Sequence, residues 1–444
     1  MLKTGYLSIL KVAFPLMVGN FVQSIVLITD MAFLARLDSV SFDAAGNAGL
    51  LYVTFYMIAA GFGDSMQITK ARFIGRNEVS VIPRFFQTGV LSLLLLALVF
   101  YLILSQVMPG LLLDYSYSSA IAEAQGEFLG IRSFALFFSL SSLALMSFLM
   151  ATGKTQIVFV SSILMSTVNI ILDYGLIFGE LGLPKMGLEG AALASVLAEV
   201  TVFIFLLFYF LLRKWIREYN LFKNFHFDLH ALKTLFSIGW PLMLQGCITL
   251  GTWTVFFSWI EQMGGHNLEI SQNIRSIYFL AFVPIFGFAA TTKTYISQFI
   301  GADRIGEIPL VQRRIQLLVT VTLLIFFHGA ILYPDFLISM INPNEVVLGD
   351  SVYIIQQVAP AIFVFGLTSV YFNTVAGSGN TMASLAIEAI STGVYLSSAY
   401  LFIYILQWDI VGIWYVEYIY FATLGIVSLV YLRFFNWTKT GRIA

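Results

Sequence analysis

Long apolar stretches, separated by short polar segments, recur along the whole chain. A helix needs roughly 20 apolar residues to cross the ~30 Å hydrocarbon core of a bilayer, and each stretch has at least that length. The stretches lack the alternation of apolar and polar positions that strands of a membrane barrel show. The pattern therefore predicts twelve membrane-spanning helices, at residues 7–35, 46–69, 86–108, 127–150, 157–178, 187–212, 236–260, 273–296, 314–340, 352–376, 383–406 and 410–433.

The composition agrees with lipid surroundings. Hydrophobic residues make up 59% of the chain and charged residues 11%, whereas soluble domains carry about 25% charged residues. Backbone N–H and C=O groups cannot stay unpaired in lipid, so helices are the expected spanning elements. We predict an all-α integral membrane protein, a monomer whose partner is the lipid bilayer and not a nucleic acid. The single cysteine, Cys247, allows no internal disulfide and no cysteine-based metal site.

Three short motifs of the first half recur in the second half at one fixed separation of 226 residues. The pairs are Phe14–Met17 with Trp240–Met243, Gly61–Phe62 with Gly287–Phe288, and Gly153–Thr155 with Gly379–Thr381. Each half carries six predicted spans, an even number, so both halves enter the membrane from the same side and are parallel repeats. The sequence thus predicts two pseudo-symmetric six-helix lobes, at 1–212 and 235–444, joined by a cytoplasmic linker at 213–234.

The basic residues predict the orientation. With both termini in the cytoplasm, nineteen of the 23 lysines and arginines fall on the inner side, as the positive-inside rule requires. The outer side or its margin receives Arg36, Arg132, Lys185 and Arg275. The expected location is the cell (inner) membrane, crossed many times, with both termini cytoplasmic.

Several polar residues lie inside the predicted spans, where an ionisable group costs at least ~2.5–3.5 kcal/mol. In the first span Asn20, Gln23 and Asp30 fall on one side of the helix, and Pro15 removes a helical hydrogen bond, so that this helix can bend. In the fifth span Asn169 and Asp173, and in the sixth Ser195 and Glu199, are four residues apart and share a face.

Two interpretations of these polar residues are open. Hydrogen bonds from Asn, Ser and Asp side chains to neighbouring helices contribute about 0.6 kcal/mol per contact, and Asn169 or Ser195 alone fits that structural role. Two carboxylates in one lobe favour ion handling, because neutral residues would join helices at lower cost. Their oxygens suit Na⁺ or a proton on a carboxyl group of raised pKa.

The second lobe has no counterpart of this acidic cluster. At the offset of 226, Asp30 corresponds to Phe256, Asn169 to Tyr395 and Asp173 to Ala399. The second lobe's own intramembrane charges are candidates for a substrate cleft or an accessory role: Lys293, Glu388 and Glu417. The first two could pair with each other.

No motif of an enzyme is present. Gly153-Lys154-Thr155 resembles the end of a phosphate-binding loop, but the glycine which that motif needs five positions earlier is replaced by Phe148. The four histidines show no metal-binding spacing on a predicted face, and no nucleophile motif appears. We therefore expect a protein that is not an enzyme and needs no cofactor.

Several segments together resemble the multidrug and toxic compound extrusion (MATE) family, part of a superfamily that includes polysaccharide and lipid flippases. They are residues 15–30, 61–75, 169–179, 187–199, 240–243 and 287–301. The resemblance implies that Asp30, Asn169 and Asp173, with Ser195, form a Na⁺ or proton site in the first lobe. It also implies that the first helix bends at Pro15. Some members carry an acid in the seventh helix where this chain has Thr249, which favours the branch that couples through the first lobe.

The resemblance implies a secondary active antiporter. It would export amphipathic, cationic drugs or toxic compounds in exchange for inward H⁺ or Na⁺ by alternating access. The abundance of Phe (42) and Met (14) suits loosely selective binding of aromatic cations. An alternative is a flippase for lipid-linked saccharides, which would need a basic cleft made from Lys70, Arg72, Arg275 or Lys293. A membrane enzyme or a proton-conducting subunit would instead show a nucleophile or a chain of charges across the bilayer.

Overall fold

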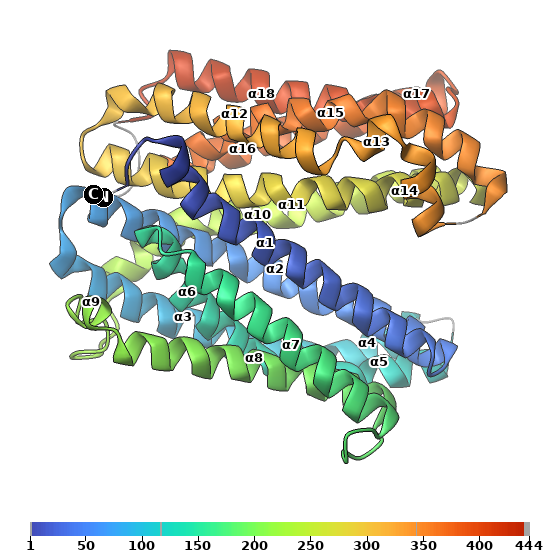
Figure 1. The fold of residues 1–444 in the computed structure, drawn as a ribbon, viewed down its shortest axis with the longest axis horizontal. Coiled ribbons are helices and arrows are strands. Elements are labelled where there is room, and N and C mark those ends of the chain that lie inside the picture. The colour runs from blue at the N-terminus through green and yellow to red at the C-terminus, as the bar shows by residue number, and fades with distance from the viewer. Residues whose placement is uncertain (1, 116–117, 343, 439–444) are drawn as a thin grey trace. The chain divides into compact units, whose positions relative to one another are not determined.

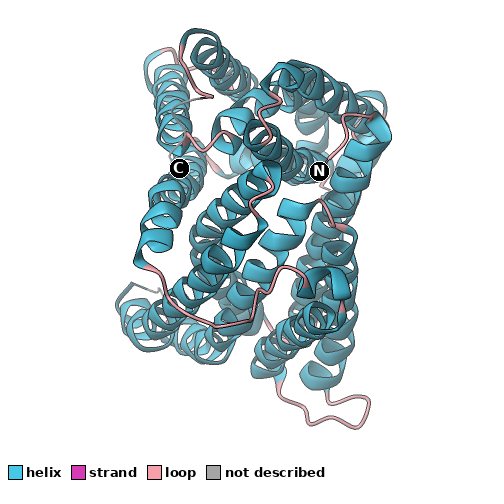
Figure 2. Cartoon of the chain, turned by 90° about the vertical axis from the view of Figure 1, so that its left-hand side faces the viewer, coloured by secondary structure: helices cyan, strands magenta, loops and turns pink. Residues whose placement is uncertain are grey.

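The computed structural model describes residues 2–115, 118–342 and 344–438. Figure 2 shows these residues as helices and connecting loops without strands. The helices, labelled in Figure 1, are α1 (Tyr6–Ala35), α2 (Ser39–Arg76), α3 (Ile82–Leu102), α4 (Met108–Tyr115), α5 (Ser119–Arg132), α6 (Leu136–Thr152), α7 (Gln156–Phe178), α8 (Gly187–Leu212), α9 (Lys214–Arg217), α10 (Leu229–Gln262), α11 (Gly265–Gly301), α12 (Ile308–Phe326), α13 (Gly329–Leu332), α14 (Pro334–Ile341), α15 (Glu345–Gly377), α16 (Thr381–Tyr400), α17 (Ile410–Trp414) and α18 (Val416–Phe434).

Twelve helical segments of the described chain are long and apolar enough to cross a membrane, which confirms the predicted number. Some spans are built from two labelled helices. A π-helical turn at Ile103–Val107 joins α3 to α4, and a 3-10 turn at Ser133–Ala135 joins α5 to α6. A second π-helical turn, Leu401–Ile405, extends α16.

Several predicted helix bounds are wrong: α2 begins at Ser39 and not at 46, and α11 at Gly265 and not at 273. Two further bounds have an identifiable local context. The ninth span was expected to reach residue 340, but α12 ends at Phe326 and the chain begins α14 at Pro334. Proline is favourable at the start of a helix and disruptive inside one, and Tyr333 before it is non-helical (φ −146°, ψ 56°), as a residue preceding proline often is. The seventh span starts at Leu229 and not at residue 236, because Asp228 caps the first turn.

The helices form two compact units. The N-terminal unit comprises Val18–Met243, and the C-terminal unit comprises Met1–Met17 with Leu244–Ala444. The chain therefore changes unit within α1, after Met17, and within α10, after Met243. These two points are 226 residues apart, the offset of the sequence repeat, and each follows a helix-internal proline, Pro15 or Pro241, by two residues. The predicted lobes, 1–212 and 235–444, describe the sequence repeat and not these compact units, and their bounds stay a prediction.

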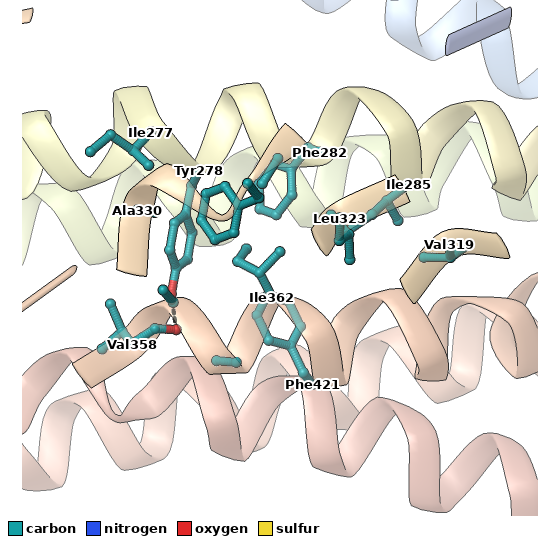
Figure 3. Packing of buried hydrophobic residues seen from close by; sticks show 14 of the residues in the cluster. Ile277, Tyr278, Phe282, Ile285, Val319, Leu323, Ala330, Val358, Ile362 and Phe421 are labelled. Carbon is teal, nitrogen blue, oxygen red and sulfur yellow. Dashed lines mark hydrogen bonds between the residues drawn. The ribbon is translucent and has the colours of Figure 1, made fainter. Parts of the chain in front are cut away.

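Aromatic and branched side chains from α11, α12, α15 and α18 fill the core of the C-terminal unit (Figure 3). Tyr278, Ile362 and Phe421 are each at most 2% exposed. The Tyr278 hydroxyl donates a 3.0 Å hydrogen bond to the Val358 carbonyl, so its one polar atom is satisfied inside an apolar cluster.

In the N-terminal unit α7 and α8 pack with their backbones in contact at Gly190. A Cβ atom at this position would lie 2.6 Å from the Leu176 carbonyl oxygen and 3.1 Å from the Ile177 nitrogen. Small residues allow such close approach between membrane helices. The contact aligns the polar face of α7, with Asn169 and Asp173, and the polar face of α8.

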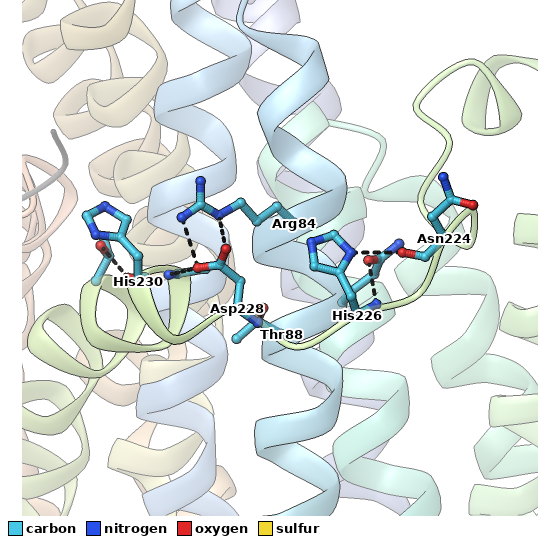
Figure 4. A network of polar contacts seen from close by, with 9 residues as sticks. Arg84, Thr88, Asn224, His226, Asp228 and His230 are labelled. Atoms are coloured by element: carbon cyan, nitrogen blue, oxygen red, sulfur yellow. Dashed lines mark hydrogen bonds and ion pairs between the residues drawn. The ribbon is translucent and has the colours of Figure 1, made fainter.

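The segment before α10 is fixed to α3 (Figure 4). The Arg84 Nη2 donates to Asp228 Oδ1 at 2.9 Å, and its Nε lies 2.7 Å from Oδ2. Asp228 Oδ1 also accepts from the Ala231 N–H at 2.8 Å, which makes Asp228 the N-cap of α10. The Gln87 amide donates to the carbonyls of Leu221 and Lys223, each at 2.9 Å.

We expect Asp228→Ala to lower the melting temperature of the detergent-solubilised protein by about 2 °C, because an N-cap contributes roughly 1 kcal/mol. The Ala231 N–H and then Arg84 hold the pKa of Asp228 below its ordinary 3.8. A lowered pKa adds stability above the ordinary value, and that stability is lost as the pH falls through the lowered one. Tryptophan fluorescence melts at pH 7 and under acid should show the difference between variant and parent shrinking below pH 3.8. An equal difference at both pH values would contradict this account.

Candidate functional site

Two carboxyl groups meet inside the N-terminal unit, one from α1 and one from α7. Asp30 and Asp173 are close enough to interact through their side-chain oxygens. The Asp173 side chain is fully buried, and Asn169, one turn earlier, is 1% exposed. At Gly19 an added Cβ would lie 3.1 Å from the Ser162 Oγ, so the glycine lets α1 approach α7 closely.

The oxygens of this cluster are available for a ligand. Asp30 Oδ1, both carboxylate oxygens of Asp173 and the Asn169 Oδ1 are buried and have no hydrogen-bond partner. An ionised carboxylate in such surroundings is costly unless it is paired. Carboxylate and amide oxygens are suitable ligands for a hard cation, and a proton would also neutralise the pair. Ser195 on α8 joins the edge of the cluster, because the Asn169 Nδ2 lies 3.5 Å from its Oγ.

A second polar group of the same unit consists of Glu199 on α8, Arg132 on α5 and Tyr52 on α2. The Arg132 Nη2 donates to Glu199 Oε1 at 2.7 Å. The Tyr52 hydroxyl lies 3.1 and 3.0 Å from the two Glu199 oxygens. The guanidinium carbon of Arg132 lies 3.8 Å from the centre of the Tyr52 ring, a cation–π contact. All three side chains are largely buried.

This second group borders a cavity of about 190 Å³. Gln23 from α1 contributes to its wall, as do several aromatic and sulfur-containing side chains, whereas Asn20 is not among the lining residues. The lining comprises Gln23, Val26, Tyr52, Val53, Tyr56, Arg132, Ser139, Ser142, Met146, Met165, Glu199 and Val202. The predicted residues Gln23 and Glu199 are thus brought to one cavity.

The two buried acids of the C-terminal unit are held by hydroxyl groups. Glu388 Oε1 accepts from Thr249 at 2.9 Å and from Tyr420 at 2.8 Å, and Glu417 Oε1 accepts from Tyr395 at 3.0 Å. The ion pairs between described residues include neither acid. The alternative that Lys293 pairs with Glu388 is therefore wrong. Lys293 itself lies half-buried on α11.

Two residues of the N-terminal unit escaped the sequence analysis. Arg132 was counted with the outer side or its margin, but its side chain is 12% exposed and ion-paired. Its position within an apolar span was the one available signal. Tyr52 carried no signal, because it is one of 21 tyrosines and its role depends on the contact with Glu199.

Comparison with known proteins places the chain among membrane transporters. The MatE family model matches residues 15–175 and again 241–401, so both ends of the match recur at the offset of 226. A probable multidrug resistance protein NorM from Synechocystis is 23% identical over 95% of this chain and 92% of its own. One from Thermotoga maritima is 26% identical over 92% and 88%.

Solved structures share the fold. An outward-facing multidrug resistance MATE family transporter of the MOP superfamily aligns with a TM-score of 0.87 at 20% identity, covering 96% of this chain and 94% of that one. A MOP superfamily transporter from Pyrococcus furiosus, described as having a binding pocket of reverse polarity, aligns with a TM-score of 0.86 at 18% identity and the same coverage. Both matches extend over nearly the full length of each chain.

Proposed function

The chain belongs to the MatE family of membrane transporters, and we propose that it exports amphipathic organic cations, drugs and toxic compounds among them, in exchange for inward H⁺ or Na⁺. It is a multi-pass membrane protein and not an enzyme. The proposal places it in the cell (inner) membrane with both termini cytoplasmic, working by alternating access. The NorM relatives are named for multidrug resistance, which supports drugs as the substrate class.

The observation that carries the coupling proposal is the pair of neighbouring carboxyl groups with unpartnered oxygens, Asp30 and Asp173. Two buried negative charges repel each other and are poorly solvated. Uptake of H⁺ or Na⁺ relieves both costs, so the pair is suited to load an ion on one side of the membrane and release it on the other. Asn169 supplies a further oxygen, Ser195 lies beside it, and Pro15 leaves α1 without one internal hydrogen bond.

A pair of carboxylates also answers an energetic requirement. One inward elementary charge yields ~2.3 kcal/mol per 100 mV, and the export of one monovalent cation costs the same amount. A one-for-one exchange therefore gains nothing from the membrane potential. Two acidic groups allow two ions per cycle, which makes the potential a driving force.

The cavity chemistry favours an organic cation over a lipid-linked saccharide. Arg132 is the one basic residue in the cavity lining, and Glu199 neutralises it. The other contributors are aromatic, methionine, valine, serine and glutamine side chains. Aromatic faces and polarizable methionines bind flat organic cations, whereas a flippase for phosphate-linked sugars would need several unneutralised basic groups.

Expression of the chain in efflux-deficient cells should lower the steady-state accumulation of ethidium several-fold. Varying the Na⁺ concentration and the external pH separately should identify the coupling ion, because lowering the gradient of that ion should abolish the difference. The Asp30→Asn/Asp173→Asn double variant, expressed at an equal level, serves as control. Equal ethidium accumulation with and without the parent protein under every ion condition would contradict the proposed function.

A further inference from the structure

Arg132 is paired with one acidic centre of the N-terminal unit and lies within electrostatic range of a second, and its guanidinium group keeps one nitrogen without a partner. One of its terminal nitrogens, Nη2, donates to Glu199. The other, Nη1, is buried and has no hydrogen-bond partner. The charge of Arg132 also acts on Asp30 and on Asp173, whose unpartnered oxygens are acceptors. The same unit therefore contains a buried donor without an acceptor, Arg132 Nη1, and buried acceptors without a donor on Asp30 and Asp173. Leaving a buried polar group unpaired costs free energy of folding.

We propose that Arg132 is a tethered cation that alternates between Glu199 and the Asp30/Asp173 pair, and that Glu199 with Tyr52 binds the cationic group of the exported compound whenever Arg132 has moved to the pair. This inference rests on the proposed ion-coupled export. It assigns the substrate-binding carboxylate, and it assigns Arg132 as the positioning residue that links ion binding to substrate binding. The structure shows the arrangement in which Arg132 is ion-paired with Glu199.

The contacts of Arg132 define what else would fit in its place. The guanidinium group sits over the Tyr52 ring at 3.8 Å and against the Glu199 carboxylate at 2.7 Å. An aromatic face beside a carboxylate is the arrangement that recognises organic ammonium and amidinium groups. The cavity of about 190 Å³ adjoins this spot, and withdrawal of the arginine side chain would enlarge it. The flat remainder of a ligand would contact Tyr56, Met146 and Met165, which line the same cavity.

Electrostatics give the alternation its direction. When the Asp30/Asp173 pair is empty and ionised, it carries two negative charges and attracts Arg132 more strongly than the single charge of Glu199 does. Glu199 is then free for an organic cation. Binding of two ions, H⁺ or Na⁺, neutralises the pair, Arg132 returns to Glu199, and the organic cation is displaced. Ion and substrate therefore exclude each other without sharing a site, which is the thermodynamic requirement of an antiporter.

The groups around Arg132 come from four helices. The titratable residues that interact with it are Tyr52 from α2, Asp30 from α1 and Glu199 from α8, together with Asp173 from α7. Tyr56 of α2 lies within electrostatic range of Glu199. Arg132 is thus the one basic group in this set, and its position determines which acid is neutralised.

The test is ethidium binding to the purified full-length protein, measured by fluorescence at low Na⁺ and alkaline pH, and again after adding Na⁺ or lowering the pH. We expect ion loading to weaken ethidium binding to the parent about tenfold, within the usual range of coupling between two sites. For Arg132→Gln, the affinity for ethidium should change by less than about twofold on ion loading. This variant should also bind ethidium more tightly than the ion-loaded parent does. Glu199→Gln should bind about tenfold more weakly than the unloaded parent and should not respond to ions.

Three variants keep the outcome decisive. Arg132→Lys retains the tethered charge and should retain the ion response, so it reports on charge even if Arg132→Gln folds poorly. Arg275→Gln removes an arginine that lies over the Phe257 ring in the other unit and should leave the response intact. The double variant Arg132→Gln/Glu199→Gln should behave like Glu199→Gln alone.

Two failures are distinguishable. If the parent binds ethidium with no response to any ion, the proposed ion coupling fails and the role of Arg132 fails with it. If the parent responds and Arg132→Gln responds equally, or if Glu199→Gln binds as the parent does, the tethered-cation mechanism is overturned while ion-coupled export stands.

Discussion

Asp173→Asn should abolish the ability of an ion gradient to concentrate substrate across a membrane. In proteoliposomes held at zero voltage, a tenfold gradient of the coupling ion supplies ~1.36 kcal/mol per ion. The parent should therefore sustain about a tenfold ethidium gradient per coupled ion, whereas the variant should equilibrate ethidium to a ratio of about one. The physical reason is that the amide cannot ionise, so the buried carboxyl pair no longer gains or loses an ion during the cycle.

Asp30→Asn should have the same effect, because the two carboxyl groups are neighbours. Glu417→Gln is the matched control, since it removes another buried carboxylate, one that is bonded to a tyrosine hydroxyl in the other unit. This control should keep the ethidium gradient. Retention of ion-driven efflux in both aspartate variants would refute the assignment of the coupling site.

Gly190→Ala should produce a large loss of stability, although it lies outside the candidate site. The new Cβ would lie 2.6 Å from the Leu176 carbonyl oxygen, and backbone atoms cannot move aside as a flexible side chain can. Helices α7 and α8 must separate, and overpacking of this kind costs about 1–3 kcal/mol. We expect a melting temperature lower by about 5 °C, together with loss of transport, because the separation also moves Asn169 and Asp173 away from Ser195.

Gly130→Ala is the control for helix propensity. Its added Cβ would meet no atom within 4 Å, and alanine is favoured over glycine inside a helix by about 1 kcal/mol. This variant should melt at the same temperature as the parent or slightly above it, as measured by tryptophan fluorescence in detergent. If both glycine variants melted alike, the close packing of α7 on α8 would not be a determinant of stability.

The sequence predicts those helices that depend only on residues adjacent along the chain. An apolar stretch of more than 20 residues specifies a spanning helix by itself, and twelve such segments are present. Their ends were less predictable, because they depend on single residues. Asp228 extends α10 toward the N-terminus through a cap and an ion pair with Arg84, and that partner lies on a different helix. Hydropathy continued past Phe326, whereas α12 ends there and the chain continues as two separate short helices, α13 and α14, the second with Pro334 in its first turn.

The candidate site divides in the same way. Asp30, Asn169 and Asp173 could be singled out because a charged or amide side chain in an apolar stretch is unusual wherever the helix lies. Glu199 also stood out, but its neutralisation by Arg132 and the contact of both with Tyr52 required three helices to meet. No spacing along the chain encodes such a meeting.

By itself, the order of apolar and polar residues determined the all-helical membrane fold, the duplication at an offset of 226 and the positions of the intramembrane acids, since each of these depends on neighbours along the chain. Tertiary structure decided which acids are neighbours, which of them has a basic partner, and where the chain changes from one compact unit to the other. The reason is that electrostatic pairing and packing act between side chains that are close in space, and helices separated by a hundred residues become neighbours only when the bundle has formed.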